Sequence, residues 1–356
     1  MYSINFSTFL LPITGFILIM TLEIEVRFMT ENFYLGNTSR FHKLFRKASE
    51  GKPVSLLFLG ASVTFGYKIP ENDQFPVRIQ KYLCNTYQND AILLHNRSVP
   101  GLSSMHALYQ CYQEAEALSP DLIVLDHSIN DQKNPDFRES YESLLTKALL
   151  LPSKPAILSF FVKSETNYSC APQMSAANEH YGIAYVDIGG ELDDCIANGK
   201  IRWSDYSYDD KHPGPVGHHF IADRIITLLQ MLDDSENTPC ILPEDAFFRR
   251  DLAYLSFAGK EWADASGNFP KQIELTLTCR TLFLSYMVDI VPEMGCLSVE
   301  IDGKNAFSLD SYRVHEWQHP EYKIFHIGPQ KETHRIVLST EAGGHKIFHL
   351  LALCYF

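Results

Sequence analysis

The chain has 356 residues, of which 46% are hydrophobic and 21% are charged, so its composition is that of a globular protein and not of a disordered one. The formal net charge of -13 at pH 7 argues against a general nucleic-acid binder, which would present a basic face. The eight cysteines form no CxxC pair and no zinc-finger spacing, which argues against a zinc ribbon and favours a reduced compartment.

The first 22 residues carry no charged side chain, and this run is nearly long enough to span a bilayer. Pro12 and Gly15 interrupt it, and it has neither a basic start nor a clear small-residue cleavage site. Residues 1–28 are therefore an uncleaved anchor, a weak signal peptide or an extension upstream of Met29, and the three interpretations stay open. The cysteine pattern favours a cytoplasmic protein, and the alternatives are membrane anchorage or secretion through residues 1–22.

Between residues 53 and 232 the chain alternates short apolar runs with helical patterns. The apolar runs predict strands buried on both faces, at 54–60, 91–96, 121–127, 155–161 and 183–188. Helical spacing predicts helices around 105–115 and over 137–150, and a last helix along the apolar stripe from Ile221 to Leu232. Such alternation predicts a parallel sheet covered by helices on both faces, with ligands bound outside the carboxyl ends of the strands.

The composition changes after the polar stretch at 233–239, beyond which helical patterns fade. The segments 273–279 and 297–309 alternate apolar and polar residues, and the second contains the hairpin turn Asp302–Gly303. Two further apolar segments flank the turn sequence EAGG at 341–344. The chain is thus predicted to consist of a hydrophobic segment (1–28), an α/β domain (29–232), a linker (233–240) and an all-β sandwich domain (241–356).

Polar residues follow the predicted strands at the edge where a ligand would bind. Ser62 comes directly after the first strand, Gly101 follows the second at a helix start, and Asn130 follows the third. Asp209 precedes His212 by three residues in the sequence DDKH, just ahead of the last helix.

These residue types are the ones that acyl transfer needs. A serine becomes nucleophilic when a histidine takes its proton, and a carboxylate fixes the tautomer of that histidine. Backbone N–H groups and a side-chain amide stabilise the oxyanion of the tetrahedral intermediate. The pattern predicts Ser62, His212 and Asp209 as a catalytic triad, with an oxyanion hole formed by the N–H groups of Ser62 and Gly101 and the amide of Asn130.

The four sequence blocks that carry these residues resemble those of the SGNH hydrolases, the GDSL-like esterases and lipases. They are GASVTFG, NRSVPG, SIND and DDKH, in the order of the family, and the resemblance covers roughly residues 53 to 232. It implies a flavodoxin-like three-layer α/β/α sandwich, followed here by a smaller all-β domain of sandwich or jelly-roll type. Ala61, Ser128 and Gly214 stand where family members often have Asp, Gly and Asn, and none of the three departures removes a catalytic atom.

Small β domains appended to SGNH domains are often seen in carbohydrate esterases. The resemblance therefore implies a serine esterase that removes O-acetyl groups from a carbohydrate through an acyl-enzyme on Ser62. The expected partner is a small-molecule or oligosaccharide ester, with no nucleic acid, no cofactor and no metal, and with membrane contact only through residues 1–22. An O-acyltransferase with the same site and a catalytically silent glycan-binding protein stay open as alternatives, and no feature predicts the oligomeric state.

Other polar residues near these blocks have competing interpretations. Asp210 competes with Asp209 as the orienting carboxylate, and the family spacing favours Asp209. Asp126 and His127 either shape the substrate pocket or form a structural pair. The residues interpreted as structural are Asp131, His218 and His219.

The sequence HEWQH at 315–319 matches the HExxH pattern of zinc proteases. Pro320 follows at once and lacks the N–H that a continuing helix needs, so we expect strands and turns there and no zinc. Aromatic residues of the β domain either form a sugar-stacking platform or fill its core; they are Trp262, Tyr286, Tyr312, Trp317 and Tyr322.

Overall fold

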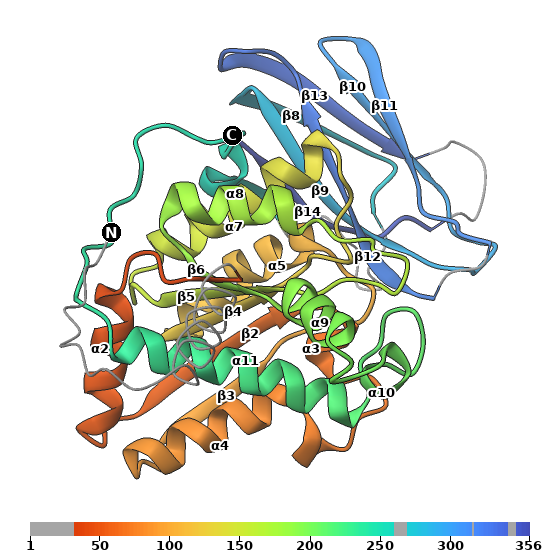
Figure 1. The fold of residues 1–356 in the computed structure, drawn as a ribbon. Helices are drawn as coiled ribbons and strands as arrows, with labels where there is room; N and C mark the ends of the chain where they lie inside the picture. The colour runs from red at the N-terminus through yellow and green to blue at the C-terminus, as the bar shows by residue number, and fades with distance from the viewer. Residues whose placement is uncertain (1–31, 260–268, 315–316, 341–346) are drawn as a thin grey trace, which may run out of the picture.

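The computed structural model describes residues 32–259, 269–314, 317–340 and 347–356. A six-stranded sheet with the order β1-β6-β5-β4-β2-β3 forms the centre of the first domain (Figure 1). Its strands are β1 (Phe33–Tyr34), β2 (Val54–Gly60), β3 (Ile92–Asn96), β4 (Leu122–Asp126), β5 (Ala156–Phe161) and β6 (Ala184–Asp187). Strands β2 to β6 are parallel in the flavodoxin-like order, and β1 adds an antiparallel edge. The predicted fold class is confirmed.

Helices cover both faces of this sheet because successive strand residues point into two different cores. Leu56 and Phe58 of β2 belong to one core, whereas Leu57 and Leu59 belong to the other. The first core is covered by α2 (Ser39–Ser49), α4 (Phe75–Tyr87), α9 (Ile188–Ala197), α10 (Trp203–Tyr206) and α11 (Pro215–Asp233). The second is covered by α5 (Ser104–Gln110), α6 (Glu116–Leu118), α7 (Pro135–Leu150) and α8 (Ala171–Tyr181), with a π-helical turn at Cys111–Ala115 between α5 and α6.

The C-terminal part of the chain is a sandwich of two antiparallel sheets, β11-β10-β13-β8 and β12-β9-β14-β7 (Figure 1). Its strands are β7 (Ser256–Gly259), β8 (Gln272–Cys279), β9 (Thr281–Val288), β10 (Cys296–Ile301), β11 (Lys304–Asp310), β12 (His319–His326), β13 (Glu332–Thr340) and β14 (Leu350–Tyr355). Asp302 and Gly303, both at positive φ, form the predicted turn between β10 and β11. The other predicted turn, at 341–344, lies outside the described residues.

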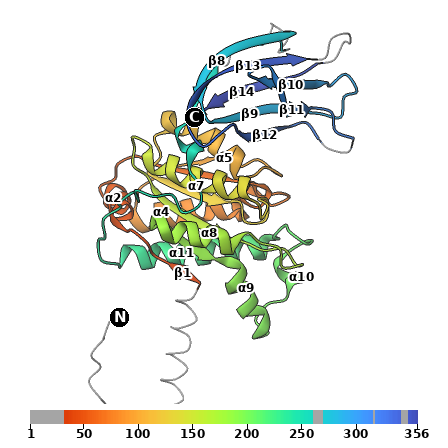
Figure 2. The same ribbon diagram turned by 90° about the horizontal axis from the view of Figure 1, so that it is seen from above.

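The sandwich lies against the helices of the second core (Figure 2). Phe283 of β9, Ile324 of β12 and Ala352 of β14 belong to the same cluster of buried side chains as Leu144 of α7. Leu284, the neighbour of Phe283, points instead into the core between the two sheets of the sandwich. Strand β9, at the centre of the sheet β12-β9-β14-β7, is therefore buried on both faces, and side chains of the two domains pack in one apolar core.

A buried carboxylate of α7 holds the connection between the domains. Glu142 has no exposed surface, and its oxygens accept hydrogen bonds from the backbone N–H groups of Phe247, Phe248 and Arg249 at 2.6–2.7 Å. The Tyr181 hydroxyl donates to the same carboxylate at 2.7 Å. This side chain therefore fixes the segment that leads into the β domain.

No helix in the described parts of the chain is long and apolar enough to cross a membrane. The hydrophobic segment predicted at 1–28 lies within residues 1–31, which are outside those parts. The interpretations given for that segment, and the domain limits drawn from composition, stay predictions.

Loss of the Glu142 carboxylate leaves three N–H groups of the connection without their acceptor. We expect Glu142→Ala to lower the free energy of unfolding by about 3 kcal/mol, measured by urea denaturation. Glu114→Ala is the matched control, because Glu114 forms an exposed pair with Arg97 at 2.8 Å, and its effect should stay below about 1 kcal/mol. Equal losses in the two variants would contradict the anchoring role of Glu142.

Candidate active site

Ser62 lies where β2 gives way to the single helical turn α3 (Ser62–Phe65). Because the parallel strands β4 and β3 flank β2, the loops that follow them lie on either side of this turn. Asn130 belongs to the loop after β4, and Gly101 to the loop after β3. Three residues predicted for the site thus come from three neighbouring strand ends.

The structure brings the three predicted triad residues into hydrogen-bond distance. His212 Nε2 lies 3.1 Å from Ser62 Oγ, and His212 Nδ1 lies 2.8 Å from Asp209 Oδ2. Asp209 Oδ1 also accepts from the backbone N–H groups of Lys211 and His212, each at 2.8 Å. Partial burial raises the pKa of Asp209, but these hydrogen bonds outweigh it and lower the pKa to about 2. Asp209 is therefore a carboxylate at neutral pH.

Asp210, the competing carboxylate, faces a different loop. Its Oδ1 accepts from the backbone N–H of Thr166 at 3.2 Å, and its carbonyl accepts from that of Glu165 at 2.9 Å. The structure therefore places Asp209, and not Asp210, against His212.

The loop of Gly101 is covered by a side chain from the β domain. Gly101 has φ of 81°, a left-handed conformation that favours glycine. A Cβ at this position would lie 3.2 Å from Cζ2 of Trp317, so the indole lies directly over the loop. On the other side of Ser62, the amide oxygen of Asn130 is buried and has no hydrogen-bond partner among the described residues.

Asp126 and His127, at the end of β4, do not form the structural pair that the sequence suggested as one possibility. Asp126 is 1% exposed, and its Oδ2 accepts from the Thr64 hydroxyl at 3.0 Å. Both ring nitrogens of His127 are buried without a hydrogen-bond partner in the described chain. Burial raises the pKa of Asp126 to about 7, and burial together with nearby His106 lowers the pKa of His127 to about 3.

Three other side chains, those of Asp131, His218 and His219, make contacts that fit their structural interpretation. Asp131 Oδ1 accepts from the backbone N–H of Ser104 at 2.8 Å, and burial raises the pKa of this carboxyl to about 7. His218 Nδ1 accepts from the backbone N–H of Phe75 at 3.3 Å. His219 Nε2 lies 3.3 Å from Oδ1 of Asp73, in the 3₁₀ turn that precedes α4.

The aromatic residues considered for a sugar platform divide into two groups. Tyr286 is 5% exposed and stacks on Phe348, and Tyr322 packs on Phe283 in the domain contact, so neither is part of an open platform. Trp317 is 52% exposed. Tyr312 is also exposed, and Trp262 lies outside the described residues.

The HEWQH sequence is only partly described, because His315 and Glu316 lie outside the described ranges. His319 begins strand β12, and its ring packs at a tilt against that of Trp317, with the two ring centroids 4.8 Å apart. The segment from His319 onward is thus a strand, as the proline that follows it predicts.

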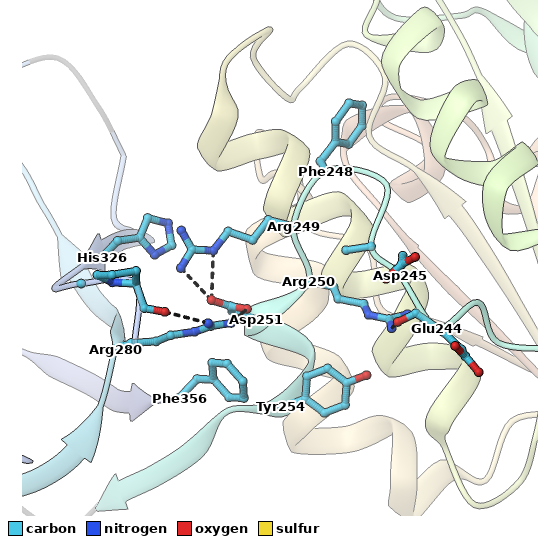
Figure 3. Close-up of a pocket in the computed structure, with 13 residues that line it drawn as sticks. Glu244, Asp245, Phe248, Arg249, Arg250, Asp251, Tyr254, Arg280, His326 and Phe356 are labelled. Atoms are coloured by element: carbon cyan, nitrogen blue, oxygen red, sulfur yellow. Dashed lines mark hydrogen bonds and ion pairs between the residues drawn. The ribbon is translucent and has the colours of Figure 1, made fainter. Parts of the chain in front are cut away.

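A pocket of about 640 Å³ lies where the connection between the domains meets the β sandwich (Figure 3). Three arginines line it, and each already donates to an acceptor. Arg249 and Arg280 both point at Asp251, at 2.7 and 2.5 Å, and Arg250 donates to the carbonyl of Pro243 at 2.8 Å. No triad residue lines this pocket, so it is separate from the predicted site and belongs to the domain contact.

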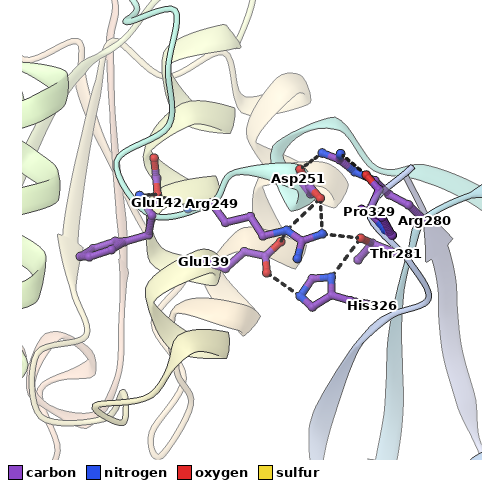
Figure 4. Close-up of polar contacts among 9 residues, drawn as sticks. Glu139, Glu142, Arg249, Asp251, Arg280, Thr281, His326 and Pro329 are labelled. Atoms are coloured by element: carbon purple, nitrogen blue, oxygen red, sulfur yellow. Dashed lines mark hydrogen bonds and ion pairs between the residues drawn. The ribbon is translucent and has the colours of Figure 1, made fainter. Parts of the chain in front are cut away.

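One group of side chains in this contact has atoms of the types that bind metals. Ligand atoms of Glu139, Asp251 and His326 lie within 4.8 Å of one another. However, Arg249 and Arg280 pair with Asp251, and the imidazole of His326 lies 2.8 Å from Glu139 (Figure 4). Two guanidinium groups already balance the carboxylate charge, and a divalent cation would be repelled by both. We therefore interpret the group as an ion-pair network that joins α7 to β12.

Two features of the site could not be found from the sequence pattern. Trp317 lies in an irregular segment before β12, far along the chain from Gly101, and an exposed aromatic residue has no periodicity to mark its position. The contact between Thr64 and Asp126 joins the turn after β2 to the end of β4, and it depends on the register that pairs Gly60 with Asp126.

Comparisons with a family model and with solved structures place the chain among known proteins. Residues 58–220 match the model of the GDSL-like lipase/acylhydrolase family. A two-domain esterase (CEX) active on acetylated mannans, co-crystallised with mannopentaose, is similar in structure, with a TM-score of 0.79 at 18% identity over 92% of this chain and 97% of that one. A catalytic mutant of Axe2, an acetylxylan esterase from Geobacillus stearothermophilus, has a TM-score of 0.43 at 14% identity over 52% of this chain and 96% of that one. No curated protein matches the sequence.

The raised pKa of Asp126 predicts how stability depends on pH. An aspartate of an unfolded chain has a pKa of about 3.9, so the folded state binds the proton of the Asp126 carboxyl more tightly than the unfolded state does. This protonation therefore stabilises the folded state at low pH, and the contribution is lost as pH rises from about 4 to about 7. Asparagine is neutral throughout, so Asp126→Asn should raise Tm by an increment that is larger at pH 8 than at pH 5. Thermal unfolding at pH 5 and at pH 8 measures the two Tm increments, and Asp234→Asn, at an exposed position, is the control. A Tm increment that is smaller at pH 8 than at pH 5 would contradict the raised pKa.

Proposed function

We propose that this protein removes O-acetyl groups from a carbohydrate through an acyl-enzyme on Ser62. The proposal starts from the family: residues 58–220 belong to the GDSL-like lipase/acylhydrolase family, which makes the protein a serine hydrolase acting on esters. The observation that carries the proposal is the line of contacts from Ser62 Oγ through His212 to Asp209. Its order is that of a nucleophile, a general base and an orienting carboxylate.

In the first half of the reaction, Ser62 Oγ attacks the carbonyl carbon of the ester while His212 Nε2 takes the hydroxyl proton. Asp209, ionised at neutral pH, holds the Nδ1–H and stabilises the imidazolium. The N–H groups of Ser62 and Gly101 and the side-chain amide of Asn130 stabilise the oxyanion. Collapse of this intermediate breaks the bond to the sugar oxygen, which leaves with the proton from His212.

In the second half, a water molecule replaces the alcohol. His212 takes a proton from the water as it attacks the acetyl-serine, and the same donors stabilise the second oxyanion. Acetate leaves, and the proton returns from His212 to Ser62 Oγ. Atoms and charges balance with no further reactant.

A carbohydrate substrate is supported by what lies around Ser62. The indole of Trp317 is half exposed and lies over Gly101, where one face of a sugar ring could stack. A second aromatic ring, that of Tyr67, packs against the imidazole of His212, with the two ring centroids 4.9 Å apart. The structurally similar two-domain esterase acts on acetylated mannans, and its similarity extends over both domains of this chain. These points favour an acetylated oligosaccharide as substrate.

Two variants test the assigned chemistry. Ser62→Ala should abolish the hydrolysis of p-nitrophenyl acetate by the full-length protein, because no other group replaces the nucleophile. Asn130→Ala should lower kcat about a hundredfold with the fold retained, because it removes one oxyanion donor. Initial rates followed by p-nitrophenol absorbance, with circular dichroism of each variant, measure both.

Surface variants Ser175→Ala and Asn198→Ala are the matched controls and should keep the wild-type rate. A Ser62→Ala protein with wild-type activity would disprove the acyl-enzyme, and near-normal activity in Asn130→Ala would remove that residue from the oxyanion hole. The same assay with an added alcohol separates hydrolysis from transfer, because transfer yields a new ester.

The proposed sugar contact predicts a selective effect at Trp317. Trp317→Ala should raise KM for acetylated manno-oligosaccharides about fivefold, since loss of an aromatic contact costs about 1 kcal/mol. KM for p-nitrophenyl acetate, which has no sugar, should change much less. Trp317→Tyr should restore most of the loss, and equal changes for both substrates would contradict a sugar-stacking role.

A further inference from the structure

The turn that carries Ser62 is held by contacts that the proposed mechanism does not use. Thr64, two residues after Ser62, is fully buried, and its hydroxyl donates to Asp126 Oδ2 at 3.0 Å. The carbonyl oxygen of Thr64 accepts from the side-chain amide of Asn96 at 2.8 Å. Asp126 ends β4 and Asn96 ends β3, so both neighbouring strands hold this one residue.

The Thr64 hydroxyl fits closely against the end of β2. A Cβ at Gly60 would lie 2.4 Å from Thr64 Oγ1 and 3.2 Å from the carbonyl oxygen of Asp126. Only glycine leaves room for the threonine side chain at this point, where the register of the sheet pairs Gly60 with Asp126. The position of the hydroxyl therefore follows from the packing of the strand ends.

The N-terminus of α3 has no side-chain capping hydrogen bond. The residue at the N-cap is Ala61, whose methyl side chain has no hydrogen-bonding atom to cap the turn. The bond from Thr64 to Asp126 thus restrains a turn that its own cap does not restrain.

The burial of Asp126 at this position lowers the stability of the folded protein. Asp126 is buried, its Oδ1 has no hydrogen-bond partner in the described structure, and Thr64 is the one group in that part of the chain that lowers its pKa. The ionisable groups coupled to it are Asp131 in the next loop, Tyr141 of α7 and Tyr206 of α10, and none of them is positively charged. A buried carboxyl that lowers stability and touches the nucleophile turn indicates a functional use.

We propose that Asp126 is a positioning residue for Ser62 and acts through the hydroxyl of Thr64. The hydrogen bond fixes the turn Ser62–Phe65 on the sheet, so that Ser62 Oγ stays in line with His212 and the Ser62 N–H stays directed at the oxyanion. This inference rests on the proposed role of Ser62 as nucleophile.

Two substitutions of Thr64 separate positioning from packing. Thr64→Val keeps the shape of the side chain and loses the hydroxyl, so kcat should fall about tenfold or more with KM changed less than about twofold. Thr64→Ser keeps the hydroxyl and loses a methyl group, so kcat should stay within about twofold of wild type although Tm falls. A residue that only fills space would give the opposite order, with Thr64→Ser the more damaged variant.

A double-mutant cycle with Asp126→Ala, which removes the acceptor of the Thr64 hydroxyl, tests whether the two residues act together. If the bond transmits the effect, the variant with both Thr64→Val and Asp126→Ala should be no slower than the slower single variant, within about twofold. Asp126→Asn keeps an amide oxygen that can accept from the same hydroxyl, so it should keep kcat within about twofold of wild type while its Tm at pH 8 rises, whereas Asp126→Ala should lower kcat about tenfold or more.

The measurements use the full-length protein, with kcat and KM for p-nitrophenyl acetate, the rate of Ser62 labelling by a fluorophosphonate, and thermal unfolding. Ser159→Ala is the control, because it removes a buried hydroxyl that the Tyr141 hydroxyl contacts at 3.0 Å, and it should keep the wild-type kcat and labelling rate. Slower labelling in Thr64→Val but not in Thr64→Ser supports the proposal.

Wild-type kcat and labelling in Thr64→Val, or fully additive effects in the cycle, overturn the positioning role and leave the proposed function intact if Ser62→Ala is inactive. An active Ser62→Ala protein that still reacts with the fluorophosphonate overturns both.

Discussion

Strand β2 lies between β4 and β3, and this order decides where three separate loops meet. Parallel strands end at one edge of a sheet, so the residues after β2, β3 and β4 converge although they are far apart in the chain. His212 reaches the same edge from the opposite direction, on a loop before α11. That loop is closed by a hydrogen bond from the Tyr208 N–H to the His212 carbonyl at 2.9 Å. The site therefore depends on sheet topology first and on local turns second.

The buried carboxylates of this protein fall into two kinds. Glu142 accepts three backbone N–H groups and a tyrosine hydroxyl, and it holds the two domains together. Asp126 accepts one hydroxyl and has an oxygen with no partner in the described chain. A buried carboxylate is tolerated when hydrogen bonds satisfy its oxygens, as they do for Glu142. A buried carboxyl with an unsatisfied oxygen, such as Asp126, lowers the stability of the folded protein. The contrast lies within one domain, and the poorly compensated group is the one beside the nucleophile turn.

The fold class could be predicted from the sequence because the central strands are buried on both faces and appear as short apolar runs. The triad could be proposed because its residues belong to blocks with a recognisable order, and the structure places Ser62, His212 and Asp209 in contact. The pairing of Thr64 with Asp126 could not, since each residue alone is an ordinary polar residue near a strand end. Tyr322 was one of the aromatic residues considered for a sugar platform, but it is partly buried because the outer face of its strand packs on α5.

The sheet β12-β9-β14-β7 forms part of two cores at once, the core of the sandwich and that of the helices α5 and α7. A module attached in this way cannot swing on a hinge without exposing apolar side chains from both sides of the sheet. The distance between the segment that carries Trp317 and the loop of Gly101 is thus set by packing and not by a flexible linker. On the proposed role of Trp317, substitutions in that short segment alone would change the selectivity for one ester over another, while the proposed catalytic residues and the joint between the domains stay as they are.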